Sequence, residues 1–96
     1  TFAFIIGEDP TYQIIEKGAW RSSETYGTIH RIASNDQVKG LAHKVFDYCS
    51  RRMPYLRIDT HEDNKPMQAA IMSYGFSECG IIYVADGSLR LAYDYY

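Results

Sequence analysis

The feature that most constrains this fold is a helix-like segment between two strand-like segments. Apolar residues recur at helical spacing from 38 to 53, and runs 26–33 and 55–61 on either side have strand-like composition. Pro54 ends the helix, and the N-cap candidates are Ser34, Asn35 and Asp36. Strands joined through a helix pair in parallel by a right-handed crossover. The apolar helix positions are Val38, Leu41, Ala42, Val45, Phe46, Cys49 and Met53.

The remaining segments predict antiparallel flanks around that parallel pair. Pro66 suits a first helical turn and Gly75 a helix end, while Asp86-Gly87 is a strong hairpin signal. We therefore expect one α/β domain over 1–96, with a mixed sheet, a central parallel strand pair, two helices and a C-terminal β-hairpin. The segments outside the parallel unit are expected to be strands 1–7 and 11–15, a loop at 16–25, a helix at 66–74 and hairpin strands 81–85 and 89–95.

Composition narrows the class of protein. The net charge of −2 and the absence of a basic stripe argue against nucleic-acid binding. No apolar run approaches the length of about 20 residues that a membrane helix needs. The isolated Cys49 and Cys79 lack metal or redox spacing, so buried free thiols in the cytoplasm are expected. The chain opens without Met on an apolar run, and we expect N-terminal elements of the domain to be missing.

The segment 37–42, Gln-Val-Lys-Gly-Leu-Ala, joins the first strand of the parallel pair to its helix. Unpaired N–H groups at a helix start, with the helix dipole, bind a diphosphate, and glycine allows close approach. The alternative is that Gly40 only permits tight helix–strand packing. A single glycine-containing loop does not decide between these interpretations.

These residues resemble the acyl-CoA signature Gln/Arg-x-x-Gly-x-Gly/Ala of the GNAT superfamily of N-acetyltransferases, at Gln37, Gly40 and Ala42. Segment 57–64 with Met67-Gln68 and Gly75-Phe76 resembles the second conserved block of that superfamily. The stretches 29–34, 79–83, 86–88 and 90–93 are similar to an uncharacterised bacterial subgroup. The resemblance extends over nearly all of the chain. It implies that the chain corresponds to the later elements of the domain, which hold the cofactor.

The resemblance implies a site for acetyl-CoA as cosubstrate. Strand residues Ile32 and Ala33 would offer backbone groups to the pantetheine arm, and the backbone of 38–43 would hold the pyrophosphate. Lys39 is either a charge beside the phosphate or a solvated side chain. Asn64 is either a pantetheine ligand or an N-cap, and both roles are compatible through different atoms. The expected residues of the phosphate loop are Val38, Lys39, Gly40, Leu41, Ala42 and His43.

The reaction implied is attack of an amine on the acetyl thioester, which needs a base and benefits from an acid. His30 is the first candidate base, because it lies on a central strand and titrates near neutral pH; the alternative is a structural histidine. Glu16 and Glu24 are weaker candidates. The superfamily's usual acid position corresponds to Ile71, which cannot donate a proton, so Tyr74, which is also expected to pack, and Tyr93 are considered instead.

The sequence therefore predicts an acetyl-CoA-dependent N-acetyltransferase acting on a primary amine of a small molecule or peptide. The alternative is a non-catalytic acyl-CoA-binding module, and a third interpretation is a structural domain that binds no ligand. No metal site is predicted, because Asp59, His61 and Asp63 suit a strand end better. An exposed edge at 2–6 makes a homodimer an expected partner. The acceptor is not identified.

Overall fold

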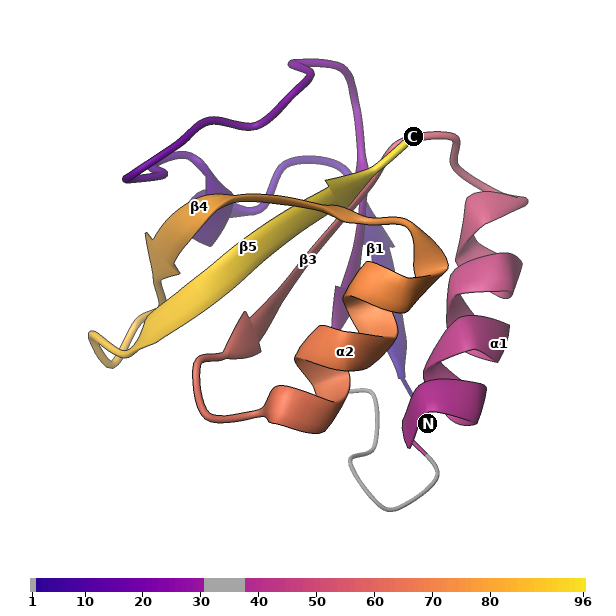
Figure 1. The fold of residues 1–96 in the computed structure, drawn as a ribbon. Helices are drawn as coiled ribbons and strands as arrows, with labels where there is room; N and C mark the ends of the chain where they lie inside the picture. Colours follow the sequence, from indigo (N-terminus) through magenta and orange to yellow (C-terminus); the bar gives the residue numbers. More distant parts are fainter. Residues whose placement is uncertain (1, 31–37) are drawn as a thin grey trace.

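The computed structural model describes residues 2–30 and 38–96, with the side chains of 38 and 39 left out. Five strands form one mixed sheet in the order β1-β2-β3-β5-β4, with two helices against one of its faces (Figure 1). This confirms the predicted α/β class. The elements are β1 (Ala3–Ile6), the 3-10 helix η1 (Pro10–Tyr12), β2 (Gly27–His30), α1 (Val38–Ser50), β3 (Leu56–His61), α2 (Lys65–Tyr74), β4 (Ser77–Tyr83) and β5 (Leu89–Tyr95).

The parallel pair predicted from the middle of the chain is β2 and β3. Their register aligns Gly27 with Leu56 and Ile29 with Ile58, and α1 makes the crossover between them. The strands on both sides are antiparallel: β1 pairs with β2, and β5 lies between β3 and β4. The single parallel ladder therefore lies inside the sheet, where both of its strands are paired and shielded.

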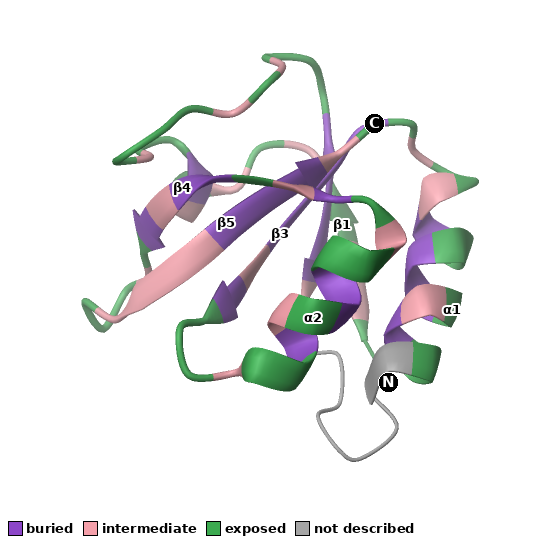
Figure 2. Cartoon of the chain, viewed as in Figure 1, coloured by how far each residue is buried: buried purple, intermediate pink, exposed green. Residues whose placement is uncertain are grey.

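The main core lies between the helices and the sheet. The buried faces of α1 and α2 point at the sheet and their exposed faces point outward (Figure 2). Asn64 caps α2 by accepting a hydrogen bond from the Met67 amide, and Gly75 ends it with a positive φ of 120°. The core residues are Ile29, Ala42, Val45, Phe46, Cys49, Leu56, Ile58, Met67, Ala70, Ile71, Phe76 and Tyr93.

A second, smaller core lies on the opposite face of the sheet, under the segment 7–26. Trp20 Nε1 donates to the Tyr12 carbonyl at 2.9 Å, and Glu16 exchanges two backbone hydrogen bonds of 2.8 Å with Ile81 of β4. Gly18 permits this close approach, because a Cβ there would lie 1.8 Å from the carbonyl oxygen of Cys79. The buried members of this cluster are Tyr12, Tyr26, Tyr55, Ile82 and Ala92.

The prediction of a strand at 11–15 was wrong. The chain instead forms η1, which Asp9 caps by accepting a hydrogen bond from the Thr11 amide. Pro10 sits in the first turn, where its fixed φ favours a helical start and its missing N–H is not needed. This local chemistry outweighs the β propensity of the following residues. Just after this segment, Glu16 forms an isolated antiparallel β-bridge with Ile81.

Both cysteines are free and buried, as expected. Burial raises the pKa of Cys49 to about 11 and that of Cys79 to about 12, so neither is a reactive thiolate at neutral pH.

Candidate functional site

A pocket of about 210 Å³ lies at the carboxyl ends of β2 and β3, beside the start of α2. Ligands of α/β proteins bind preferentially at the carboxyl ends of parallel strands, because loops and helix starts converge there. Residues from both faces of the sheet line the pocket, which therefore lies at the ends of β2 and β3 and is reached from both faces. Its lining residues are Ile29, His30, Ile58, Asp59, Thr60, His61, Asn64, Met67 and Arg90.

The pocket lies just beyond the described register of the parallel pair. That register ends at Ile29 and Ile58, and β3 continues to His61, where it pairs with β5 on its other side. Residues 31–37, which follow β2 in the chain, lie outside the described residues. Asp59, Thr60 and His61 of β3 line the pocket, so this strand end is the part of the sheet that a ligand in the pocket would contact.

Asn64 joins the pocket to the start of α2. Its Oδ1 accepts from the Met67 amide at 3.2 Å, which satisfies one orphan N–H of the helix. Its Nδ2 makes no hydrogen bond with any described residue, and the side chain lines the pocket. The N-cap role is confirmed, while the second role through Nδ2 stays a prediction.

His30 lines the pocket from the end of β2. Its neighbour Ile29 belongs to the helix-side core, so alternation along the strand turns His30 to the opposite face, under segment 7–26. Its Nε2 lies 3.2 Å from Asp9 Oδ2. Burial would raise the pKa of Asp9, but hydrogen bonds from Thr11 and the proximity of His30 lower it below its ordinary value. Asp9 is therefore ionised at neutral pH and holds one ring nitrogen of His30.

A second polar group lies on the same wall. Asp59 accepts a hydrogen bond of 2.6 Å from the Tyr12 hydroxyl and lies 3.4 Å from Arg90 Nη1. Burial and the adjacent Asp59 raise the pKa of Tyr12 well above its usual value, so this phenol stays protonated. Arg90 Nε is buried with no hydrogen-bond partner among the described residues. The wall of the site thus holds a buried donor that no described residue satisfies.

The start of α1 is described only in part. Ile32, Ala33 and Gln37 lie outside the described residues, and for Val38 and Lys39 only the helical backbone is described. Gly40 is exposed, and a Cβ built there meets no atom within 4 Å among the described residues. Nothing among the described residues therefore requires glycine at this position for tight packing.

The other predicted loop residues divide between the core and the surface. Ala42 is fully buried in the main core, whereas Leu41 is exposed. The His43 side chain ties α1 to α2, with Nε2 2.9 Å from Ser73 Oγ and 3.1 Å from the Ala70 carbonyl oxygen. A ligand role for His43 is consequently limited to its backbone.

The candidate acids lie away from this pocket. The Tyr74 hydroxyl donates to Asp47 at 2.6 Å, and its ring packs against Phe46 and Phe76, so it points toward α1. Tyr93 is 2% exposed within the helix-side core. Neither lines the pocket. Tyr74 packs as its position suggested, and the geometry does not support a catalytic role for it at this pocket.

Comparison with solved structures adds the deciding observation. The chain superposes on the crystal structure of a GNAT-family acetyltransferase from Streptococcus agalactiae with a TM-score of 0.85 and 33% sequence identity. The chain has the GNAT fold. The superposition includes 98% of this chain and 56% of that protein, so the chain spans about half of its relative. The resemblance to the GNAT superfamily inferred from the sequence is thereby confirmed.

No protein-family model and no curated protein matches the chain. In the described part of this GNAT-fold chain, no helix has the length and apolar character needed to span a bilayer.

Sequence reasoning missed three members of the site. Asp9 and Tyr12 lie in a segment that was expected to form a turn and a strand, and Arg90 was seen only as part of the resemblance. One available signal was Asp-Pro followed by Thr, which is typical of a capped helical turn that would direct Asp9 and Tyr12 to the sheet. Nothing local indicated that Tyr12 meets Asp59.

Proposed function

We propose that this chain is the cofactor-binding part of an acetyl-CoA-dependent N-acetyltransferase that acts on a primary amine. The observation that carries the proposal is the pocket at the carboxyl ends of the parallel strands β2 and β3, which His30, Asp59 and Asn64 line. The likeness to a GNAT-family acetyltransferase supports the same class of reaction.

The pantetheine arm suits the pocket because it is extended and carries two amides. Its amides would pair with backbone groups of β3 at Asp59–His61, which line the pocket, and Asn64 Nδ2 would donate to it. The pyrophosphate would bind at the first turn of α1, because the first N–H groups of a helix have no partner within the helix and Gly40 carries no side chain to block the approach.

His30 is the proposed base. In this reaction the amine nitrogen attacks the thioester carbonyl carbon, the carbon–sulfur bond breaks, and the coenzyme A thiolate leaves. His30 would take the proton of the amine, and Asp9 would hold the imidazole in place through its 3.2 Å contact. Residues of β3 beyond Ile58 would provide the N–H that stabilises the oxyanion.

A second function is supported by one specific observation. None of the described residues places an unengaged tyrosine hydroxyl in the pocket, because Tyr12 donates to Asp59 and Tyr74 to Asp47. A protein without an acid for the leaving thiolate would bind acyl-CoA without rapid turnover. A non-catalytic acyl-CoA-binding module is therefore the alternative proposal.

Calorimetric titration with acetyl-CoA tests both proposals, using Gly40→Glu, Gly40→Gln and Gly40→Ala variants. Wild-type binding should be saturable, and Gly40→Glu should weaken it at least tenfold by repelling the pyrophosphate. Gly40→Gln separates size from charge, and Gly40→Ala checks the backbone. A negative charge in the first helical turn is favourable to the helix, so the Glu variant should stay folded.

An amine panel then distinguishes catalysis from binding. Release of coenzyme A with any amine supports the transferase, while binding without release supports the module. Absence of binding by folded wild-type chain contradicts both.

A further inference from the structure

We infer that the acceptor amine carries a carboxylate, which Arg57 binds in a separate pocket on the face of the sheet opposite the helices. This inference rests on the proposed transferase function for the identity of the ligand, but the anion site itself does not. The pocket measures about 340 Å³, and its lining residues are Glu8, Tyr12, Gln13, Trp20, Ser23, Tyr26 and Arg57.

Arg57 is a buried cation without an ionic partner among the described residues. Its side chain lies on β3 and the residue is only 6% exposed. Nη2 donates to the Ser22 carbonyl at 2.7 Å, and Nε lies 3.4 Å from the Tyr55 hydroxyl. It makes no salt bridge with any described residue. A guanidinium removed from water without a carboxylate is costly, which favours a site that an anion completes.

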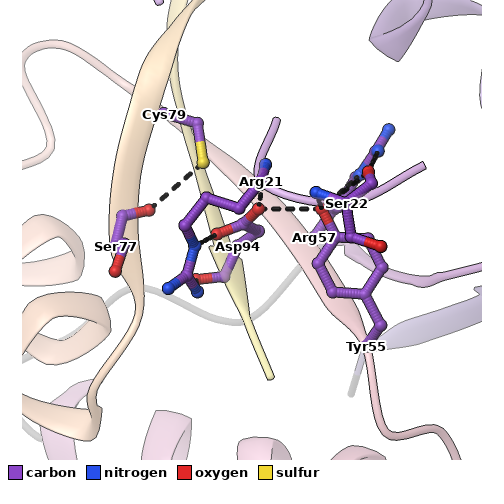
Figure 3. A network of polar contacts seen from close by, with 7 residues as sticks. All are labelled: Arg21, Ser22, Tyr55, Arg57, Ser77, Cys79 and Asp94. Atoms are coloured by element: carbon purple, nitrogen blue, oxygen red, sulfur yellow. Dashed lines mark hydrogen bonds and ion pairs between the residues drawn. The ribbon is translucent and has the colours of Figure 1, made fainter. Parts of the chain in front are cut away.

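The buried carboxylate nearest in the network is not a direct partner of Arg57. Asp94 is fully buried, but it is already engaged by Arg21 and by the Tyr55 hydroxyl at 2.8 Å (Figure 3). Burial would raise the pKa of Asp94, yet hydrogen bonds from the Arg21 amide, the Tyr55 hydroxyl and the Arg21 guanidinium lower it. Asp94 thus forms its ion pair with Arg21, and the Tyr55 hydroxyl lies between Asp94 and Arg57.

Aromatic rings hold the guanidinium in place. Its central carbon lies 4.2 Å from the ring centre of Trp20 and 4.0 Å from that of Tyr26. Both rings line the pocket with Arg57, so the arginine forms part of a rigid, partly apolar wall. Nη1 makes no hydrogen bond with a described residue, and Arg57 lines the pocket, so Nη1 is the proposed donor to a ligand. A planar guanidinium fork is well suited to a carboxylate.

The position of the pocket relative to His30 indicates which molecule carries the carboxylate. Arg57 is aligned with Thr28, and His30 is two residues further on the same face of β2. Strand geometry then separates the Cα atoms of Arg57 and His30 by about 8 Å. Tyr26 connects the two places, since its hydroxyl accepts from the Asp9 amide at 2.8 Å and Asp9 contacts His30.

The two places differ in charge. The Asp9 carboxylate beside His30 favours an amine, and Arg57 favours a carboxylate. An amino acid carries both groups and would therefore contact both places.

The single tryptophan of the chain allows a test without turnover, because Trp20 stacks on Arg57. Trp20 fluorescence is titrated with 4-aminobutanoate, with its amide 4-aminobutanamide, and with butylamine. We expect saturable binding of the carboxylate and at least tenfold weaker binding of the other two. Equal binding of all three, or no binding of the carboxylate, overturns the inference and needs no variant.

Variants locate the site. Arg57→Gln should abolish the preference for the carboxylate and Arg57→Lys should retain part of it, with folding checked by circular dichroism. Asp63→Asn removes an exposed charge outside this pocket and should not weaken carboxylate binding. An equal loss in Asp63→Asn and Arg57→Gln contradicts a specific role of Arg57.

Acetyl-CoA titration of the same samples separates the two proposals. Acetyl-CoA binding without carboxylate selectivity refutes the acceptor inference alone. Carboxylate binding without acetyl-CoA binding refutes the transferase proposal and leaves the anion site.

Discussion

The hydroxyl of Tyr12 donates a hydrogen bond of 2.6 Å to Oδ1 of Asp59, a residue 47 positions further along the chain. Tyr12 lies in η1, above the face of the sheet opposite the helices, and Asp59 is on β3 at the wall of the pocket. The contact links the segment that covers the Arg57 pocket to the strand end where acyl-CoA is proposed to bind. The two proposed ligand sites therefore share one rigid connection.

His30 and Asp9 should affect catalysis more than cofactor binding. We predict that His30→Gln lowers kcat about 100-fold or more, since a positioned base contributes that much to proton transfer. Asp9→Asn should lower kcat by about tenfold, because it weakens the hold on the imidazole. Steady-state kinetics together with acetyl-CoA calorimetry measure both effects. A matched loss of acetyl-CoA affinity would instead indicate a structural role.

Tyr74 should be dispensable for the reaction. Its hydroxyl is engaged by Asp47 of α1, so Tyr74→Phe should leave kcat within about twofold and cost about 1 kcal/mol of unfolding free energy, the usual value of one such hydrogen bond. Urea denaturation and amine turnover measure the two quantities. A large fall in kcat in a variant of normal stability would restore Tyr74 as a candidate acid.

Two adjacent residues of α2 provide a matched test of the core. Ile71 is fully buried between helix and sheet, whereas Met72 is 50% exposed. Ile71→Ala should lower the unfolding free energy by about 2–5 kcal/mol through lost burial and a cavity. Met72→Ala should change it by less than about 0.5 kcal/mol. Similar values from denaturant melts of the two variants would contradict the orientation of α2.

Asp94 should make the fold sensitive to acid. Its pKa is lowered in the folded state, so its contribution is fully present above the ordinary aspartate pKa of about 3.9 and is lost as the pH falls below it. Asp94→Asn should lower the free energy of unfolding at pH 7 by on the order of 2 kcal/mol, because its hydrogen bonds to Arg21 and Tyr55 are weakened. The difference in unfolding free energy between this variant and wild type should shrink toward pH 3.

Asp63→Asn is the control for this experiment, because its side chain is 87% exposed. It should behave as wild type at both pH values in denaturant melts. A constant difference between Asp94→Asn and wild type from pH 7 to pH 3 would argue against the proposed linkage.

The edge strand β1 should promote self-association of this chain. Among the described residues it pairs with β2 alone, and Ile5 and Ile6 are each more than half exposed. We predict concentration-dependent dimerisation in sedimentation velocity, reduced by Ile5→Lys, which places a charge on the edge. A wild-type chain that sediments as a monomer at all concentrations contradicts this prediction.

The sequence by itself determined the elements whose signals are local and periodic. The spacing of Val45, Phe46 and Cys49 predicted α1, and the turn Asp86-Gly87 predicted the hairpin of β4 and β5. The crossover rule then predicted the parallel pair. Those features depend on residues near one another in the chain, where propensity and periodicity apply. The same approach failed at 11–15, because the capped turn at Asp9-Pro10 outweighed β propensity.

Only the tertiary structure decided which side chains meet. Asp9 contacts His30 across 21 positions, and Arg57 lies between Trp20 and Tyr26, because the segment 7–26 folds back over the sheet. The path of that segment depends on long-range packing, such as the close approach at Gly18 and the bridge from Glu16 to Ile81. Such contacts arise from shape and burial across the fold, and no local pattern in the sequence encodes them.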